Sequence, residues 1–134
     1  MTRRLVAAAV ALVLVLSSEA MAQSPEDRAS AALAAVEAFR VLKPGGRAVI
    51  VPSAEIDILP AVWERHGFRV VARDTTARAA FRVRRVLIAG DTAAVIVEAA
   101  LRDASGRQAE WRDFTLVRDG DVWVVSDVKL ILIT

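Results

Sequence analysis

The chain has 134 residues, of which 55% are hydrophobic and 25% are charged, and it contains a single His and no Cys, Tyr or Asn. This length suits one domain with a modest core and is too short for two. The missing residue types exclude disulfides, thiolate metal sites, a tyrosine general acid and N-glycosylation.

The N-terminal segment has the three parts of a secretory signal peptide. Two arginines precede an apolar run at residues 5–16, and the small-x-small sequence AMA ends at Ala22. This run is shorter than the roughly 20 residues that a membrane-spanning helix needs, which favours a cleaved leader over the alternative, an uncleaved anchor. We therefore expect cleavage after Ala22, a mature domain over residues 23–134, a bacterial periplasmic or secreted location, and no stable membrane insertion once residues 1–22 are removed.

Basic and acidic residues nearly balance once this leader is removed. Its loss takes two arginines and one glutamate from 18 basic and 16 acidic residues, which leaves 16 and 15, a net charge of +1. We therefore expect no nucleic-acid partner. The distribution is uneven, because residues 65–85 contain seven Arg and one acid, whereas residues 86–134 are acidic overall. Either these blocks face each other or solvent, or some of the arginines form an exposed stripe that binds an anionic surface. The stripe would consist of Arg69, Arg73, Arg78 and Arg82.

The first part of the mature domain is predicted to contain two helices and two short strands. The sequence SPED at residues 24–27 is typical of a helix start, with an N-cap Ser, a Pro in the first helical position and two acids in the first turn. Apolar residues then recur at helical spacing until KPGG ends the run at residues 43–46. A buried strand over 47–51 follows. A second helix over about 53–66 contains Pro60, which either kinks it or opens a new first turn, and Gly67 precedes a strand over 68–72.

From Phe81 onward the pattern changes to long strands joined by hairpin signals. The signals are Gly90-Asp91, a loop at 103–106 and Asp119-Gly120. Helices first and strands afterwards, without βαβ alternation, predict an α+β fold. We expect N-terminal helices packed on a curved four-stranded antiparallel meander over residues 81–132, with one or two short extra strands at 47–51 and 68–72. The four strands are expected over 81–89, 92–102, 107–118 and 121–132.

The hairpin registers bring several polar residues to one face of this sheet. A two-residue turn at Gly90-Asp91 places Val83 opposite Glu98, Arg85 opposite Ile96 and Leu87 opposite Ala94, and a four-residue loop at 103–106 places Glu98 opposite Trp111. A turn at Asp119-Gly120 places Arg112 opposite Asp127, Phe114 opposite Val125 and Leu116 opposite Trp123. The alternation changes phase at Arg84-Arg85, which indicates a bulge that would turn Arg85 outward. The candidate site for a polar or anionic ligand consists of Arg85, Glu98, Trp111, Asp113 and Ser126.

Two interpretations of this cluster stay open. It is either a salt-bridge network of the sheet or a ligand site in which Arg85 binds a carboxylate, Trp111 forms an aromatic wall, and Asp113 or Glu98 acts as a base. The chain contains no catalytic motif. One His and no Cys predict no metal site, no sequence feature predicts a cofactor, and His66 is expected to stabilise a helix end. At least two of Trp63, Trp111 and Trp123 are expected in the core.

Apolar residues are expected on both faces of the sheet, although helices on one side cover only one face. The apolar C-terminus, residues 130–133, adds to this surface. We therefore expect either a homodimer through the sheet face or a concave pocket for a small polar or anionic ligand.

Two segments resemble known families. Residues 36–72, with VEAFRVLKPGGRAVIV and LPAVWERHGFRVV, look like the late part of class I S-adenosylmethionine-dependent methyltransferases, but the glycine-rich cofactor turn of that family has no counterpart here. The order of helices before strands, ending in LVRDGDVWVVSDV, resembles the NTF2-like and cystatin-like α+β superfamily. That resemblance implies helices on a curved sheet, and its isomerase-type site uses a Tyr that this chain lacks.

The function predicted from the sequence is that of a small exported binding or accessory domain of the cell envelope. The alternative is an NTF2-like enzyme, of isomerase or hydrolase type, that uses a pocket carboxylate such as Asp113 or Glu98.

Overall fold

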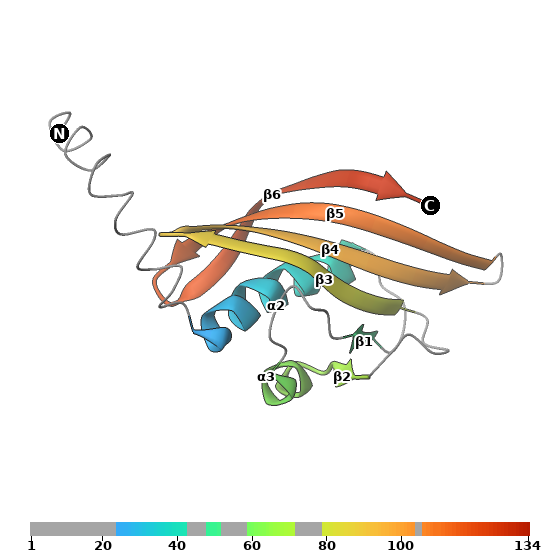
Figure 1. The fold of residues 1–134 in the computed structure, drawn as a ribbon, viewed down its shortest axis with the longest axis horizontal. Helices are drawn as coiled ribbons and strands as arrows, with labels where there is room; N and C mark the ends of the chain where they lie inside the picture. Colours follow the sequence, from blue (N-terminus) through green and yellow to red (C-terminus); the bar gives the residue numbers. More distant parts are fainter. Residues whose placement is uncertain (1–23, 43–47, 52–58, 72–78, 104–105) are drawn as a thin grey trace, which may run out of the picture.

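The computed structural model describes residues 24–42, 48–51, 59–71, 79–103 and 106–134, so the predicted leader lies outside the described residues. Six strands form one open sheet in the order β2-β1-β3-β4-β5-β6, and helix α2 lies along one face of it (Figure 1). No helix in these ranges is both long and apolar enough to cross a membrane. The elements are α2 (Pro25–Leu42), β1 (Ala48–Val51), α3 (Pro60–Arg65), β2 (Arg69–Val70), β3 (Ala79–Ala89), β4 (Thr92–Asp103), β5 (Gly106–Asp119) and β6 (Val122–Ile133).

The described sheet is mixed, and the two short extra strands predicted at 47–51 and 68–72 belong to it as β1 and β2. β1 pairs parallel with both β2 and β3, whereas β3, β4, β5 and β6 pair antiparallel in chain order. Two parallel strands need a crossover connection, and α3 supplies it between β1 and β2. The expectation that βαβ alternation is absent was therefore wrong. Strands of four and two residues carry no sequence signal for the direction in which they pair.

Helix α2 begins and ends where its sequence predicts. The Ser24 hydroxyl oxygen accepts a hydrogen bond from the backbone N–H of Asp27 at 3.1 Å, which satisfies one of the free donors of the first turn. The predicted apolar stripe, including Val36 and Phe39, is fully buried. Leu42, the last residue of the helix, is 49% exposed and stands outside that stripe.

Helix α3 begins at Pro60, so this proline opens a first turn, as one of the two sequence interpretations has it. The earlier part of that predicted helix, residues 53–58, lies outside the described residues. Gly67 has φ +83° and follows the C-cap His66, which is the left-handed position where glycine ends helices.

The core lies between α2, α3 and the helix-covered face of the sheet, which we call the helix face. Phe39 contacts Phe81 and Phe114 there, each at 5.7 Å between ring centroids. Trp63 and Trp123 are buried, as expected for at least two of the three tryptophans. The residues of β4 that alternate with this face point to the opposite side of the sheet, which we call the outer face.

The β3–β4 pairing contains the predicted bulge. Arg85 lies opposite Ile96 and Leu87 opposite Ala94, as predicted. The register shifts between Val83 and Arg85, so Arg84 is the extra residue of the bulge. Beyond it, the predicted pairing of Val83 with Glu98 is wrong, because the bulge moves Val83 to Val97 and places Arg82 opposite Glu98.

The β4–β5 register places Glu98 opposite Trp111, as predicted. The β5–β6 register is wrong by two residues, because the turn consists of Gly120-Asp121 rather than Asp119-Gly120. Gly120 has φ +64° and the described chain has no positive φ outside glycine, so only the first turn residue is left-handed, as a type II′ turn requires. Two further register shifts then alter the predicted partners. Leu116 lies opposite Val125 instead of Trp123, Phe114 opposite Val128 instead of Val125, and Arg112 opposite Leu130 instead of Asp127.

Candidate functional site

The predicted outer-face cluster forms only in part, and its arginine is Arg84. Both Nε and Nη2 of Arg84 donate hydrogen bonds to one oxygen of Glu98, with the Nε contact at 2.8 Å. The same guanidinium lies 4.9 Å from the ring centroid of Trp111, which is the cross-strand neighbour of Glu98. An ion pair and a cation–π contact thus hold these three side chains together.

The remaining three predicted residues lie apart from this contact. Arg85 lies opposite Ile96 and is exposed, whereas Arg84, the extra residue of the bulge, is partly buried. Asp113 of β5 also lies opposite Ile96, and its Oδ1 is buried and has no hydrogen-bond partner among the described residues. Ser126 sits at a second register shift and donates to the carbonyl oxygen of Thr115 at 3.2 Å. The structure therefore brings together Glu98 and Trp111 of the predicted set, and adds Arg84.

A small cavity of about 240 Å³ lies on the outer face next to this contact. Its lining includes two alanines, Ala80 and Ala100, which are cross-strand neighbours on β3 and β4, and three charged residues, Arg82, Glu98 and Arg107. The described residues that line it are Val51, Ala80, Phe81, Arg82, Glu98, Ala100 and Arg107.

Arg82 is the cavity residue with unmet hydrogen-bonding capacity. Its Nε is buried and has no hydrogen-bond partner in the described part of the chain. Its cross-strand neighbour is Glu98, but Arg84 already binds that carboxylate. A buried donor without an acceptor is costly, so native proteins rarely leave one empty. Arg82 therefore brings to the cavity wall a guanidinium group with one buried donor that lacks an acceptor among the described residues.

Arginines outnumber acids among the described residues that line the cavity. Arg82 and Arg107 belong to this lining, and its one described acid, Glu98, is bound by Arg84. Arg102 stands opposite Arg107 in the β4–β5 register and adds another positive charge at this end of the strands. Guanidinium groups suit carboxylate and phosphate oxygens because their donors form a planar fork.

Two of the four arginines of the predicted exposed stripe, Arg69 and Arg82, lie within the described residues. Arg73 and Arg78 lie outside the described residues. Arg69 is exposed on β2, but Arg82 is partly buried and lines the cavity. Strand alternation explains the difference, because Arg82 sits beside the buried Val51 in a central strand.

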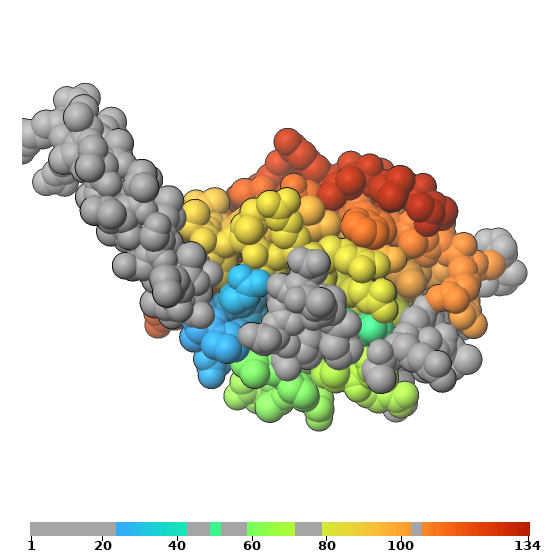
Figure 2. All heavy atoms as spheres, viewed as in Figure 1, coloured from blue at the N-terminus to red at the C-terminus, as the bar shows by residue number. Residues whose placement is uncertain are grey.

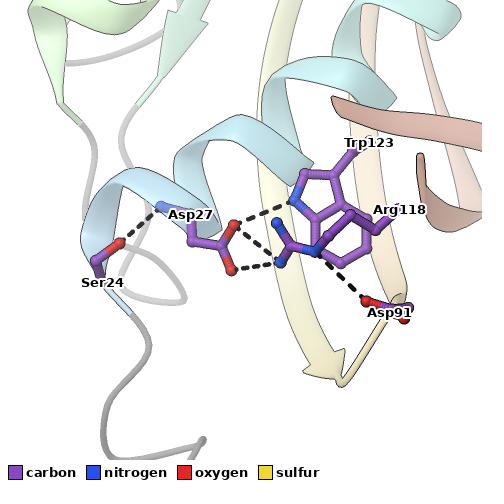
Figure 3. A network of polar contacts seen from close by, with 5 residues as sticks. All are labelled: Ser24, Asp27, Asp91, Arg118 and Trp123. Carbon is purple, nitrogen blue, oxygen red and sulfur yellow. Dashed lines mark hydrogen bonds and ion pairs between the residues drawn. The ribbon is translucent and has the colours of Figure 1, made fainter. Parts of the chain in front are cut away.

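The helix face carries a second polar group that the sequence reasoning did not identify. Both carboxylate oxygens of Asp27 accept hydrogen bonds from Nη2 of Arg118, at 3.1 and 3.0 Å, and Oδ1 also accepts one from Nε1 of Trp123 at 3.3 Å (Figure 3). The guanidinium of Arg118 lies 4.1 Å from the Trp123 ring centroid. Asp91, in the turn between β3 and β4, is a weaker neighbour at 3.8 Å from Arg118 Nε.

A third ion pair lies deeper on the same face. Glu110 is 1% exposed, and one of its oxygens accepts a hydrogen bond from Nε of Arg112 at 2.6 Å. Arg112 lies 5.6 Å from the ring centroid of Phe39. The alternation that puts Phe114 on the helix face assigns both residues to it too, so the signal was present in the sequence. Among the described carboxylate side chains of the sheet, Glu110 is therefore the buried one, whereas Asp113 and Glu98 are partly exposed.

The described residues contain no group of three or more His, Cys, Asp and Glu side chains that could hold a metal ion. His66 lies at the end of α3 with its Nδ1 3.9 Å from an oxygen of Glu37 on α2. This exposed contact joins two helix surfaces and lies away from the cavity residues.

Comparisons of the chain with protein-family models, with curated proteins and with solved structures find no match. The resemblance to NTF2-like and cystatin-like proteins therefore stays a prediction from the sequence.

Proposed function

We propose that this chain is a small exported binding or accessory domain of the bacterial envelope that holds a small anion in the outer-face cavity. The observation that carries the proposal is the buried Nε of Arg82, which has no acceptor in the described part of the chain. A carboxylate or phosphate oxygen would fill that role. Drug-sized ligands occupy pockets of roughly 300–1,000 Å³, so a cavity of about 240 Å³ suits a smaller molecule.

Two features of the cavity wall support an anion rather than a neutral ligand. Arg82 and Arg107 line the cavity, and among the described lining residues the one acid, Glu98, is already bound by another arginine. Binding an anion there adds charge-assisted hydrogen bonds without bringing two uncompensated negative charges together. Trp111, held beside Glu98 by Arg84, offers an aromatic surface next to the cavity.

We also propose the finer architecture that the superfamily resemblance implies, in which α2 and the four strands β3 to β6 form the basic unit. Support comes from the antiparallel pairing of these strands in chain order and from the packing of α2 against them. β1, α3 and β2 are then an addition at one edge of that unit.

The ligand proposal is tested by isothermal titration of the purified protein with inorganic phosphate, acetate, succinate and citrate. We expect at least one of these probes to bind, and Arg82→Gln to weaken its binding about tenfold or more, because a charge-assisted hydrogen bond contributes roughly 1.5–3 kcal/mol. The matched control is Arg85→Gln, which removes an exposed arginine from the same strand and should leave binding unchanged.

Glu98→Gln provides a second arm of this test. It removes a negative charge from the cavity wall and loosens Arg84, so anion affinity should rise. Absence of binding for all four probes, or equal loss in Arg82→Gln and Arg85→Gln, would contradict the proposed site.

Export is tested separately. Mass spectrometry of the protein recovered from the periplasmic fraction or the medium of a bacterial host should give a chain that begins at Gln23. A full-length chain in the cytoplasm or the membrane fraction would contradict both the leader and the envelope location.

A further inference from the structure

The last strand of the sheet, β6, is a long edge strand with an unusual surface. Its neighbour on one side is β5, and it is the terminal strand of the sheet order. Figure 2 shows its atoms, in red, along one margin of the molecule. Natural proteins usually protect such an edge with prolines, several charges or a short strand, because its free N–H and C=O groups can pair with another chain. β6 has twelve residues, no proline and one lysine.

Most large side chains of β6 are apolar and exposed. Leu130, Ile131, Leu132 and Ile133 are 46–50% exposed, and Val122 and Val124 are 62% and 44% exposed. The strand therefore presents apolar side chains near both of its ends. Between them lie its two charged residues, Asp127 and Lys129, which are both exposed and have no ionic partner in the described part of the chain.

We propose that two copies of this chain pair through β6, antiparallel, about a two-fold axis at Val128. In that register Asp127 of each copy lies opposite Lys129 of the other, so the dimer contains this ion pair twice. The apolar ends also meet, because Val124 lies opposite Leu132 and Val125 opposite Ile131. The partner is a second copy because this strand is complementary to itself in both charge and hydrophobicity.

The side chains that meet in this register also share the same faces of the sheet. In the β5–β6 pairing, Val124 lies opposite Val117, Asp127 opposite Thr115, Lys129 opposite Asp113 and Leu132 opposite Trp111. These four partners alternate along β5 and belong to the outer face. The register shifts near Ser126 and Ile131 keep the four β6 residues on one face, although they are not evenly spaced in the sequence. Pairing two copies thus extends one sheet through both molecules, with the ion pairs on the outer face.

Charge reversal distinguishes this register from other modes of association. Sedimentation velocity of the protein expressed from its full-length gene should show a dimer. Asp127→Lys and Lys129→Asp should each raise the dimer dissociation constant about tenfold or more, since each replaces two attractive cross-strand pairs with two repulsive ones. The double variant Asp127→Lys/Lys129→Asp restores opposite charges and should restore the dimer.

A cysteine on the axis gives an independent readout. The chain contains no Cys, and Val128→Cys places two thiols directly opposite each other, within the distance that a disulfide spans. Oxidation should therefore give a covalent dimer. In the control Val122→Cys, the two thiols lie at opposite ends of the paired strands, and no intermolecular disulfide should form at the same protein concentration.

Each outcome decides the proposal. A wild-type monomer at all concentrations tested overturns it, as does a dimer that both single charge reversals leave intact. Loss of the dimer in the single variants without recovery in the double variant overturns the register. Thermal unfolding of every variant confirms that each one is folded. The anion site is judged by ligand titration, so either proposal can fail without the other.

Discussion

Two groups of arginine, carboxylate and tryptophan lie on opposite faces of the sheet and differ in what they connect. On the helix face, Arg118 binds both oxygens of Asp27 and lies over Trp123. Asp27 belongs to the first turn of α2, whereas the other two residues flank the β5–β6 turn. This group therefore fastens the start of the helix to one end of the sheet, across 91 residues of sequence.

On the outer face, Arg84 binds one oxygen of Glu98 and lies over Trp111. All three residues come from β3, β4 and β5, strands whose backbones already pair with one another. Their ion pair spans 14 residues of sequence and adds little that the backbone hydrogen bonds have not fixed. The same side-chain chemistry thus orients a helix in one place and shapes the wall of a cavity in the other.

The largest loss of stability is expected when the carboxylate of the helix-face group is removed. Asp27→Ala deprives Arg118 and Trp123 of their shared acceptor, and both donors are partly or fully buried. We expect the free energy of unfolding to fall by about 2–3 kcal/mol. Urea denaturation measures it. Glu26→Ala is the control, because it removes an exposed acid from the same helical turn and should cost less than about 1 kcal/mol. Equal losses in the two variants would mean that Asp27 stabilises the protein only through the helix dipole and not through its contacts with Arg118 and Trp123.

Replacing each tryptophan by phenylalanine should give a smaller difference in the free energy of unfolding, again with the larger loss in the helix-face group. Trp123→Phe keeps a buried ring but removes the Nε1 donor to Asp27, so we expect a loss of about 1 kcal/mol or more. Trp111→Phe keeps a ring beside Arg84, and the Trp111 indole donates no hydrogen bond within the described part of the chain, so the loss should stay below that of Trp123→Phe. The reverse order of the two losses, measured by urea denaturation, would contradict the roles assigned to the two groups.

Local signals in the sequence predicted much of the outer-face group. The phase change at Arg84-Arg85 predicted the bulge, and the hairpin loops predicted that Glu98 faces Trp111. The predicted arginine, Arg85, was the wrong one. The bulge brings both Arg84 and Arg85 near the outer face, and only the folded structure shows that Arg84 reaches the carboxylate of Glu98.

The helix-face group could not be predicted in this way. The sequence placed Asp27 in a first helical turn and Trp123 after a glycine turn, and each has a sufficient local explanation. Neither pattern predicts that the start of α2 lies over the β5–β6 turn, because that contact depends on how the helix crosses the sheet. The parallel pairing of β1 with β2 and β3 escaped prediction for a similar reason, because tertiary packing decides the pairing partners of very short strands.

The outer-face ion pair should couple more weakly than the helix-face pair. In a double-mutant cycle of Arg84→Ala and Glu98→Ala, we expect a coupling energy of about 0.5–1 kcal/mol, as is usual for partly exposed pairs. The cycle of Asp27→Ala and Arg118→Ala should give a larger value, because Arg118 contacts both oxygens of Asp27 and Trp123 donates to the same carboxylate. A coupling in the first cycle that equals or exceeds the second would mean that the outer pair has a stabilising role of its own.

The smallest effect is expected at the rim of the helix-face group. Asp91 lies 3.8 Å from Arg118 but is 88% exposed, so solvent screens their attraction. Asp91→Asn should therefore lower the free energy of unfolding by less than about 0.5 kcal/mol. The chain offers a matched control in Asp121→Asn, which makes the same change after the glycine of the other hairpin, Gly120. Equal losses of stability in the two variants would mean that each aspartate acts only within its own turn. A loss at Asp91 that exceeds the loss at Asp121 and vanishes in high salt would extend the helix-face group to the β3–β4 turn, and the start of α2 would then be held by two hairpins instead of one.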